Sequence, residues 1–467
     1  MQIYNTLTRK KEELVPIEPG KIRMYACGPT VYDYFHIGNA RCFVIFDMLR
    51  RYLRYRGYDV TFVQNFTDID DKIINRANRE GSTQKEVSER FIAEYFKDAK
   101  GLGIEPATVH PKATENIDTI IDIISVLVDK GYAYAVDGDV YFRTGKFKDY
   151  GKLSHMPIDD LESGARIDVS SQKEDPLDFA LWKAAKPGEP MWDSPWGKGR
   201  PGWHIECSAM VRKYLGETID IHCGGQDLTF PHHENEIAQS ECATGKCFSH
   251  YWMHNGYINV DNKKMSKSLG NFFTVRDVAE KYGYLPIRHF ILAAHYRSPI
   301  NYTTEIIEQS KNAVDRINNC TEAVKFYLAN TPASAMTEAE RPILERIEGY
   351  KQAFINDMDD DFNTADAMSE IYNIIRELNP LVTGTGASTE LVSKAYDIYN
   401  ELVTLMGFSA NESHDEELIK EIEELIEKRA EAKKAKDYAE ADRIREYLAG
   451  KGVTLKDTKQ GTQYTIG

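Results

Sequence analysis

The chain has 467 residues, 42% of them hydrophobic and 28% charged, with a formal net charge of −15 at pH 7. That length exceeds what one hydrophobic core supports and predicts about three domains, and the composition is that of an ordinary globular protein without a membrane span or a signal-peptide core. The acidic balance argues against non-specific coating of nucleic acid but allows a local basic surface, and seven scattered cysteines indicate a reducing cytoplasm rather than a disulfide framework.

The first predicted unit is a strand, a helix and a second strand. Residues 21–27 form the first strand, which the turn at Gly28-Pro29-Thr30 ends, and apolar residues at helical spacing follow over 40–58. Residues 59–65 form the second strand. A β-α-β unit implies a parallel sheet, and such sheets bind ligands at the carboxyl ends of their strands. Cys27 and the run FTDIDDK lie at those ends.

The next hundred residues read as an insertion into this sheet domain. Helical patterns run through 86–102 and 114–130, and a hairpin is predicted about Asp137-Gly138. A looser segment rich in Gly, Pro and Trp follows to residue 202. A buried strand at 218–222 then returns to the sheet, followed by the turn GGQD and a helix from about His232. A short strand at 257–260 and a turn at Asp261-Asn262 complete this part.

From Val275 onward the pattern is almost wholly helical. The predicted helices cover 285–295, 306–328, 342–358, 366–378 and 390–406. An acidic stretch then turns basic over 428–436 and ends in a β-like tail. We therefore predict an α/β fold: a Rossmann-like parallel-sheet domain with an insertion, an all-α helical bundle and a small C-terminal α+β domain. The predicted boundaries are 1–100 and 203–300 for the two halves of the sheet domain, 101–202 for the insertion, 301–410 for the bundle and 411–467 for the tail.

Cysteine, histidine and carboxylate side chains concentrate in residues 200–236. Mixed nitrogen, sulfur and oxygen ligands indicate a metal site, and zinc is the metal that most often takes them. His232 and Glu236 are four residues apart, so they would share one face of a helix. The alternative is that the cysteines are ordinary buried thiols and that His233 and Glu234 form a polar helix start. The candidate sulfur ligands are Cys27, Cys207 and Cys223.

Two short motifs could bind a triphosphate. The run His36-Ile37-Gly38-Asn39 lies between a strand and a helix, where phosphates meet a helix N-terminus, and His36 could donate to phosphate oxygens in the transition state. Gly38 would let a nucleoside approach the backbone closely. In the run KMSKS, Lys264 and Lys267 could neutralise the charge on a departing pyrophosphate. Taken separately, the motifs also fit a polar loop at a helix start and a solvated basic turn.

Together and in this order, the two motifs resemble the HIGH and KMSKS signatures of class I aminoacyl-tRNA synthetases, with Asn39 in place of the final histidine. Longer runs narrow the resemblance to the cysteinyl-tRNA synthetase family. These runs are MYACGPTVYDYFHIGNAR, NFTDIDDKII, DFALWK, RPGWHIECSAM, DIHCGGQDLTFPHHENEIAQSE, KMSKSLGN and AKKAKDYAEADRIREYLAGKGVTLKDTKQGT. The resemblance spans nearly the whole chain and is least specific around 330–411. It implies that the sheet domain is catalytic and that residues 411–467 bind the anticodon.

The resemblance also implies a role for individual residues. One zinc ion per chain would sit at the base of the amino-acid pocket, and Mg²⁺ would accompany ATP, held mostly by the phosphates. The implied zinc ligands are Cys27, Cys207, His232 and Glu236. The implied lining of the cysteine pocket is Thr30, Thr67, Trp203 and His222. The implied contacts to ATP are Gly38, Asn39, Asp227 and Lys267, and the groups that would stabilise the transition state are His36, Lys264 and Lys267. The other cysteines would be ordinary thiols, because Cys242 and Cys247 have no further ligand pair nearby.

The implied reaction joins L-cysteine to tRNA(Cys) in two steps, through cysteinyl-adenylate. Serine differs from cysteine only by oxygen for sulfur, and zinc binds a thiolate far better than a neutral hydroxyl. We therefore expect selection against serine at the metal and no editing activity in the insertion. We expect a cytoplasmic monomer whose partners are ATP, L-cysteine and tRNA(Cys), with no membrane. Lysines within 428–436, with Arg443 and Arg445, are candidates for contacts to the tRNA backbone, although a solvated helix face would also explain them.

Two other functions remain open at this point. One is an enzyme that passes activated cysteine to an amino-sugar, as in mycothiol ligase, but such a chain lacks the C-terminal RNA-binding region. The other is a non-catalytic RNA-binding paralogue, which decayed motifs would mark. The chain retains His36, Lys264, Lys267 and all four proposed metal ligands.

Overall fold

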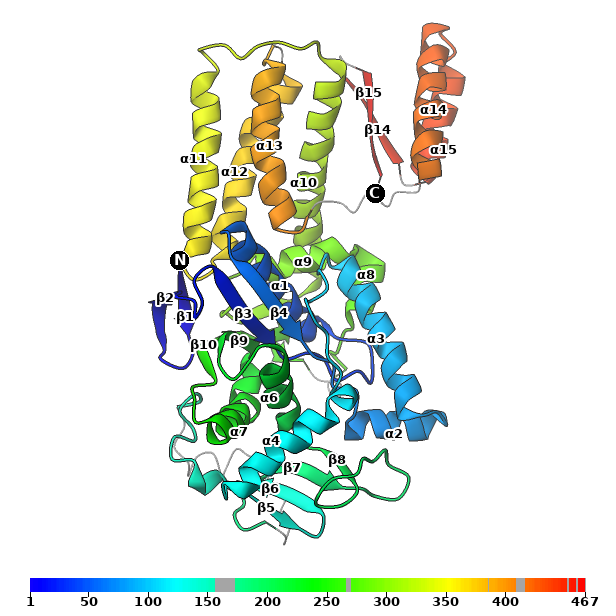
Figure 1. Cartoon of the computed structure of the whole chain (residues 1–467). Coiled ribbons are helices and arrows are strands. Elements are labelled where there is room, and N and C mark those ends of the chain that lie inside the picture. Colours follow the sequence, from blue (N-terminus) through cyan, green and yellow to red (C-terminus); the bar gives the residue numbers. More distant parts are fainter. Residues whose placement is uncertain are drawn as a thin grey trace. The chain divides into compact units, whose positions relative to one another are not determined.

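The computed structural model describes residues 1–155, 173–265, 270–384, 386–408, 416–451, 453–458 and 461–466 (Figure 1). The chain divides into two compact units. Unit 1 comprises Met1–Glu308 with Met358–Ala365, and unit 2 comprises Gln309–Asp357 with Asp366–Gly467.

The centre of unit 1 is a four-stranded parallel sheet, so the predicted β-α-β unit and α/β class are confirmed. The strand order is β10-β9-β3-β4, and every neighbouring pair is parallel. The helix α1 (Ile37–Tyr55) connects β3 to β4, and Gly57 follows it with a φ of 89° that favours glycine. The strands are β3 (Lys21–Ala26), β4 (Asp59–Gln64), β9 (Ile219–Gly225) and β10 (Ser249–Asn255).

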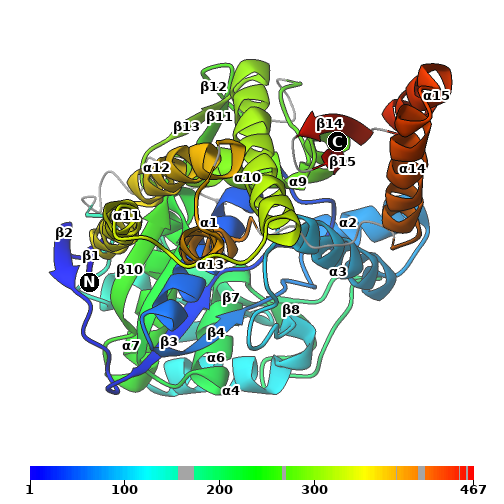
Figure 2. The ribbon, with the colours of Figure 1, turned by 90° about the horizontal axis from the view of Figure 1, so that it is seen from above.

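Helices cover both faces of this sheet. The helix α1 lies on one side of β3 and β4, and α6 (Trp203–Tyr214) and α7 (Glu234–Thr244) lie on the other, with α4 (Ile117–Asp129) beyond them (Figure 2). Apolar side chains of the sheet and of the second helical layer form one buried core between them. Its members include Tyr25, Val63, Met210, Ile237 and Trp252. This packing brings α6 and α7 to the carboxyl ends of β3 and β4.

Two helices follow β4 where the sequence predicted one. The structure adds α2 (Asp71–Glu80) before α3 (Gln84–Gly101). The short helix α2 buries only Ile73, Ile74 and Ala77, which is too few to show a helical period within an acidic run. Asp70 accepts a hydrogen bond from the backbone N–H of Lys72 and thereby starts the helix.

The insertion contains an antiparallel sheet of order β5-β6-β7-β8. The predicted hairpin joins β5 to β6, and Asp137 and Gly138 both have positive φ, as a tight two-residue turn requires. The loose, Gly-rich segment contributes the other two strands. The elements are η1 (Ala113–Glu115), α4 (Ile117–Asp129), β5 (Ala133–Val136), β6 (Asp139–Phe142), η2 (Thr144–Lys146), β7 (Phe179–Ala184) and β8 (Gly199–Pro201).

A second small sheet lies next to the KMSKS run. Its central strand β11 (Ile258–Val260) pairs antiparallel with β12 (Lys263–Lys264) and parallel with β13 (Ile300–Tyr302). The strand β13 interrupts a region that the sequence predicted as almost wholly helical, because three residues are too short for a strand pattern. The remaining elements of unit 1 are β1 (Gln2–Asn5), β2 (Lys10–Glu13), α8 (Val275–Tyr282) and α9 (Tyr284–Leu292).

Unit 2 consists of a helical bundle and a small α+β part. Long helices run side by side in the bundle (Figure 1). They are α10 (Thr304–Asn330), α11 (Arg341–Asp359), α12 (Thr364–Thr383) and α13 (Thr389–Leu405), and the first residues of α10 and α12 and the last two of α11 belong to unit 1. The chain continues through α14 (Glu416–Lys434), α15 (Tyr438–Gly450), β14 (Val453–Thr458) and β15 (Gly461–Ile466). Among the described residues, no helix combines the length and the apolar character needed to cross a membrane.

Candidate metal centre and active site

Four buried side chains from four elements meet at the carboxyl end of β3. Cys27 directly follows β3, Cys207 lies in α6, His232 lies in the turn η4 (Thr229–His233), and Glu236 lies in the first turn of α7. Their ligand atoms all lie within 4.8 Å of one another. The sequence predicted this set through the resemblance, and the fold brings all four together.

The distances that involve sulfur match the edges of a tetrahedral zinc site, whereas the 3.0 Å between His232 Nε2 and Glu236 Oε1 is shorter than the nitrogen–oxygen edge of about 3.4 Å. The Cys27 and Cys207 Sγ atoms are 3.8 Å apart, and Cys207 Sγ lies 3.6 Å from His232 Nε2. Cys27 Sγ lies 3.5 Å from Glu236 Oε1. Zinc bonds of about 2.3 Å to sulfur and 2.0–2.1 Å to nitrogen give tetrahedral edges of about 3.8 Å between sulfurs and 3.6 Å between sulfur and nitrogen. The donor set therefore fits zinc both in ligand type and in the spacing about its sulfurs.

A second group of potential ligands overlaps the first. Cys27 and Glu236 also lie near His222 and His233, with ligand atoms inside the same 4.8 Å limit. This group has one sulfur instead of two. Its Cys27 Sγ to His233 Nε2 distance of 3.3 Å is shorter than a tetrahedral edge, as is the His232–Glu236 distance of the first group, so the number of sulfurs separates the two groups. The first group is the better match for zinc. His222 then acts on the site through Glu236, whose Oε2 lies 2.8 Å from His222 Nε2.

His233 and Glu234 do stand at the start of α7, as the alternative held, but they are not merely a polar helix start, because both side chains are fully buried and hydrogen-bonded. His233 Nδ1 lies 2.8 Å from His254 Nε2, and the Glu234 carboxylate accepts hydrogen bonds from the backbone N–H groups of Leu153 and Ser154. The run HHENE therefore faces the protein interior, which the sequence spacing did not reveal.

His232 and His254 each have a second nitrogen held by a neighbour, whereas the buried Nδ1 of His222 has no hydrogen-bond partner among the described residues. His232 Nδ1 lies 2.8 Å from His204 Nδ1, and His254 Nδ1 lies 2.8 Å from Thr6 Oγ1. A hydrogen bond at the far nitrogen fixes the tautomer and orientation of a metal-binding imidazole. His204 was not among the predicted site residues, and its only sequence signal is its place in the run PGWHIEC, three residues before Cys207.

The side chains of the cluster shift one another's pKa values in opposite directions. The hydrogen bond with Cys27 lowers the pKa of Cys207 to about 6, whereas burial raises the pKa of Cys27 well above its ordinary value. Burial by itself would lower the pKa of His232, but the charge of Glu236 and hydrogen bonds with Cys207 and Glu236 raise it to about 10. Burial opposes ionisation of Glu236, yet the charges of His222 and His232 lower its pKa to about 2. The Glu236 carboxylate and the Cys207 thiolate thus face a protonated His232. A metal cation bound here would take the place of that proton and balance the two negative charges.

The predicted cysteine-pocket residues surround this cluster. The Trp203 ring lies 4.3 Å from the His232 ring and is 42% exposed, so it forms the open side. The buried His222 ring stacks on Trp252 at 4.4 Å. Thr30 and Thr67 pair with each other through their backbones, and the Thr67 hydroxyl donates to Glu206 Oε2 at 2.8 Å. The Thr67 hydroxyl is therefore held by the protein itself.

Asn65 lies next to the cluster, with its Oδ1 4.0 Å from Cys207 Sγ, and it was not among the predicted site residues. Its Oδ1 accepts hydrogen bonds from the Gly28 backbone N–H at 2.9 Å and from the Tyr25 hydroxyl at 3.0 Å. A Cβ at Gly28 would overlap the carbonyl oxygen of Asn65, so only glycine allows this approach. The position of Asn65 at the end of the second parallel strand was a usable signal, since such ends form ligand sites.

The HIGH-like motif caps the helix α1. His36 is its N-cap, and His36 Nδ1 accepts a hydrogen bond from the Asn39 backbone N–H at 3.2 Å. Gly38 and Asn39 lie half-buried in the first turn. Because Nδ1 accepts, a neutral His36 ring carries its proton on Nε2 and can donate from there.

The described part of the KMSKS run lies beside this motif. A Cβ at Gly38 would sit 3.2 Å from Met265 Cε, and the His36 ring lies 5.1 Å from that of Phe272. The Ile37 backbone N–H donates to the Phe273 carbonyl at 3.2 Å. Lys264 is exposed in β12, and Asp227 is exposed in the turn η3 (Gln226–Leu228). Lys267 lies outside the described residues.

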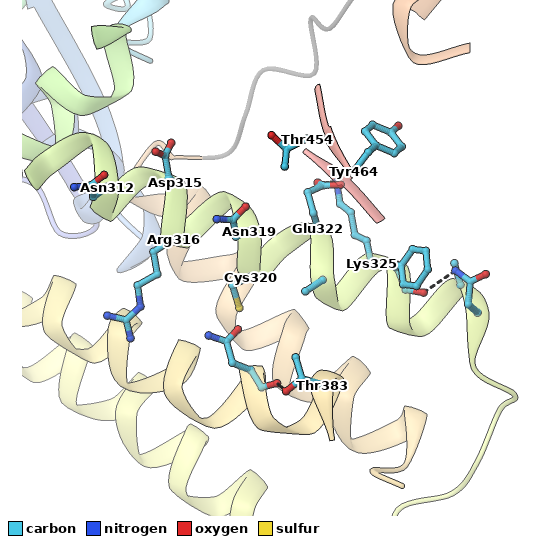
Figure 3. Close-up of a pocket in the computed structure, with 15 residues that line it drawn as sticks. Asn312, Asp315, Arg316, Asn319, Cys320, Glu322, Lys325, Thr383, Thr454 and Tyr464 are labelled. Carbon is cyan, nitrogen blue, oxygen red and sulfur yellow. Dashed lines mark hydrogen bonds and ion pairs between the residues drawn. The ribbon is translucent and has the colours of Figure 1, made fainter. Parts of the chain in front are cut away.

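A pocket of about 760 Å³ lies elsewhere, in unit 2 (Figure 3). Asp315 and Arg316 of α10 and Thr454 and Tyr464 of the C-terminal hairpin contribute to its lining. None of the predicted site residues lines it, and its polar groups form no set of metal ligands among the described residues. The metal-ligand cluster and the two motifs in unit 1 are therefore the site that carries chemistry.

Three family models match the chain. Residues 13–312 match the class I tRNA synthetase (C) catalytic domain, residues 353–411 match the DALR domain, and residues 415–464 match the cysteinyl-tRNA ligase anticodon binding domain. A cysteine–tRNA ligase of Clostridioides difficile (strain 630) is 58% identical over 464 residues, covering 99% of each chain. That of Anoxybacillus flavithermus (strain DSM 21510 / WK1) is 54% identical over the full length of both chains.

Solved structures share the fold at low identity. A methionyl-tRNA synthetase of Mycobacterium tuberculosis in complex with methionyl-adenylate superposes with a TM-score of 0.61 at 16% identity, over 83% of this chain and 90% of that one. A leucyl-tRNA synthetase, LeuRS, of Agrobacterium radiobacter K84 in a ternary complex superposes with a TM-score of 0.58 at 13% identity, over 85% and 86% of the two chains. These similarities support the class I fold.

Proposed function

Because the chain belongs to the cysteine–tRNA ligase family of class I aminoacyl-tRNA synthetases, we propose that its buried cluster of two cysteines, a histidine and a glutamate selects the amino acid. The activity is that of a cysteine–tRNA ligase, in which ATP activates L-cysteine to cysteinyl-adenylate and the cysteinyl group passes to the 3′ end of tRNA(Cys). The observation that carries the proposal is the set of tetrahedral sulfur distances among Cys27, Cys207, His232 and Glu236.

Selection between cysteine and serine requires more than pocket shape, since near-isosteres are separated only weakly by packing. A zinc ion held by the four ligands would supply a soft Lewis acid that prefers a thiolate to a neutral hydroxyl. His222 would keep Glu236 in place, His204 would keep His232 in place, and the exposed Trp203 ring would line the open side of the pocket. We propose that this arrangement makes an editing site unnecessary and that the insertion does not hydrolyse mischarged tRNA.

The ATP side of the site uses the HIGH-like and KMSKS motifs. His36 would donate from Nε2 to a phosphate oxygen, because the Asn39 backbone N–H occupies its Nδ1. Gly38 and Asn39 would meet the nucleoside at the N-terminus of α1, and Asp227 would bind the ribose or the substrate ammonium group. Lys264 and Lys267 would stabilise the departing pyrophosphate, and Mg²⁺ would accompany the ATP phosphates.

The C-terminal region would bind the tRNA, and the structure narrows the set of residues available for it. Arg429 and Lys433 form ion pairs with Asp457, and Arg443 forms one with Glu440. Other basic residues form no ion pair with a described residue, and we propose these for contacts to the tRNA backbone. They are Lys428, Lys434, Lys436 and Arg445.

We also propose that the enzyme acts as a monomer in the cytoplasm, on ATP, L-cysteine and tRNA(Cys). All seven cysteine side chains are free, which agrees with a reducing compartment. Sedimentation of the purified enzyme at increasing concentration tests the monomer, and a dimer that persists on dilution would overturn it.

The experiment that tests the function is cysteine-dependent exchange of pyrophosphate into ATP, run beside serine, with and without a strong zinc chelator. Exchange with cysteine that the chelator abolishes is the expected result, followed by transfer of cysteine to tRNA(Cys). Exchange that survives complete removal of the metal would overturn the role of the cluster. Absence of exchange from folded, metal-loaded protein would overturn the catalytic function and favour an RNA-binding role.

A further inference from the structure

Arg41 is a fully buried cation in the second turn of α1, two residues after the HIGH-like motif. Its guanidinium donates four hydrogen bonds, all to backbone carbonyls. Nη1 donates to Tyr257 at 2.8 Å, and Nη2 donates to Ser298 at 2.5 Å, to Tyr296 at 3.1 Å and to His295 at 3.3 Å. No described carboxylate forms an ion pair with Arg41, and burial lowers its pKa to about 10.

Such a group is costly, because a buried charge without a counter-charge loses its hydration. Two other buried arginines differ in this respect. Arg50 and Arg288 both form ion pairs with the buried Asp47. Arg41 instead uses the planar fork of its guanidinium to hold several carbonyls at once. The segments that carry these carbonyls therefore indicate which parts of the structure Arg41 holds together.

Those carbonyls come from two segments that are about forty residues apart in the sequence and enter the same small sheet. Tyr257 directly precedes β11, and Ser298 lies two residues before β13. The two strands pair in parallel, and the Ile300 backbone N–H donates to the Tyr257 carbonyl at 3.0 Å. The Gly256 backbone N–H donates to the Tyr296 carbonyl at 2.9 Å. Arg41 thus binds both strands at the ends where they begin.

The other edge of β11 leads into the KMSKS run. Asn259 pairs with Lys264 and Val260 pairs with Lys263, so the first lysine of the motif is in register with β11. The next residue, Met265, reaches Gly38 in the first turn of α1. A continuous set of contacts therefore runs from α1 through Arg41, β11 and β12 to Lys264, and returns to α1 through Met265.

We propose that Arg41 is a positioning residue for adenylate formation: it holds the sheet β11–β13, and with it Lys264, in register with His36 at the start of α1. The inference deepens the proposed function and rests on it, because His36 and Lys264 must face one triphosphate. A displacement of about 1 Å between groups that stabilise one transition state can cost about 100-fold in rate. Arg41 touches neither substrate nor reacting atoms, so its effect is on geometry alone.

The test replaces Arg41 with lysine, which keeps the charge and loses the fork. We expect Arg41→Lys to lower kcat for cysteine-dependent ATP–pyrophosphate exchange by about 10- to 100-fold and to raise KM for ATP. KM for cysteine and the bound zinc should stay unchanged, because the metal cluster lies on other elements. Amide hydrogen exchange should become faster in 256–264 and 295–302 and stay unchanged at β3 and β4.

The matched control is Arg288→Lys. Arg288 is also fully buried, lies in α9, and donates to the Leu102 carbonyl and to Asp47 Oδ2. We expect this variant to lose stability without the selective loss in kcat. Should Arg41→Lys not fold, Arg41→Gln is measured in its place, since its amide supplies two uncharged N–H donors.

Several results would overturn the proposal. These are an unchanged kcat in a folded Arg41 variant, an equal loss in Arg288→Lys, or a loss of zinc or of cysteine binding. Failure of both Arg41 variants to fold while Arg288→Lys folds would make Arg41 a general structural residue and would also overturn it. Absence of pyrophosphate exchange in the unmutated enzyme would refute the proposed function instead. The role of Arg41 in holding the sheet would then be judged from amide hydrogen exchange alone. Faster exchange confined to 256–264 and 295–302 would support that role, and no change there would overturn it.

Discussion

The catalytic half of unit 1 and the helical bundle of unit 2 bury different kinds of side chain. Around the sheet, full burial extends to charged groups such as Arg41, Asp47 and Glu236. In the described bundle residues 309–357 and 366–408, no charged side chain is buried, and the buried polar groups include Ser310, Ser388 and the hydroxyls of Tyr327 and Tyr399. The first region adds polar contacts of fixed geometry to its apolar core. The second is held by packing of apolar surfaces.

This difference explains why the catalytic half of unit 1 contains motifs that identify the family from the sequence, whereas the helical bundle does not. A buried charge or metal ligand needs specific partners at specific distances, so the residue types around it are narrowly constrained. A helical bundle needs apolar residues at helical spacing and about the right volume, which many sequences satisfy. We therefore expect substitutions in the first region to change chemistry and substitutions in the second to change stability.

The largest effect should come from Cys207→Ser, which tests the first half of this comparison. A hydroxyl is a poor zinc ligand, so we expect loss of bound metal, a fall of at least about 100-fold in kcat/KM for cysteine and weaker discrimination against serine. Metal analysis and pyrophosphate exchange with both amino acids measure this. Cys223→Ser is the control, because Cys223 is equally buried in β9 but lies in neither ligand group. Unchanged metal content in Cys207→Ser would remove that residue from the ligand set.

Phe354→Ala should show the opposite behaviour in the bundle. Phe354 is fully buried in α11, and its truncation leaves a cavity that typically costs about 3–5 kcal/mol. We expect the unfolding transition of unit 2 to move to lower denaturant concentration while kcat for pyrophosphate exchange is retained under native conditions. A change in KM for cysteine in this variant would break the separation between the two regions.

The number of protons released when zinc binds tests the protonation states of the metal-ligand cluster. At pH 7 the metal-free cluster holds a proton on His232, whose pKa is raised to about 10, and on Cys27, whose pKa is raised well above its ordinary value. Zinc binds the deprotonated forms, so binding should release about two protons, and affinity should rise with pH across the neutral range by roughly 100-fold per pH unit. Calorimetry in buffers of different ionisation enthalpy measures the number. Release of no proton would contradict the protonation states described here.

The smallest effect should come from Glu340→Gln in the bundle. The Glu340 carboxylate accepts hydrogen bonds from the backbone N–H groups of Thr337 and Ser388, which lower its pKa from 4.5 to about 2. A lowered pKa contributes stability above pH 4.5 that is lost as the pH falls toward 2. Because the side chain is partly exposed, we expect the substitution to cost less than about 1 kcal/mol at pH 7 and the difference from the unmutated protein to disappear near pH 2. Denaturant unfolding at several pH values checks this, and a difference that persists at pH 2 would rule out Glu340 ionisation as its source.

Much of the fold was readable from the sequence because local spacing determines which face a residue occupies. The β-α-β unit, the hairpin at Asp137-Gly138 and the long bundle helices all follow from period and turn chemistry. The short elements α2 and β13 did not follow, because each has too few residues to show a period.

The sequence by itself determined the family and the order of the motifs, since long runs such as DIHCGGQDLTFPHHENE occur where chemistry restricts the choice of residue. The four proposed ligands came from the family resemblance, because spacing left Cys223 and His233 open. Only the tertiary structure decided that His204 supports His232, that Asn65 holds Gly28 and that the HHENE run faces inward. The tertiary structure also decided that Arg41 donates hydrogen bonds to backbone carbonyls more than two hundred residues further along the chain. Sequence spacing fixes neighbours within one helix or strand, whereas these partners meet only after separate elements have packed against one sheet.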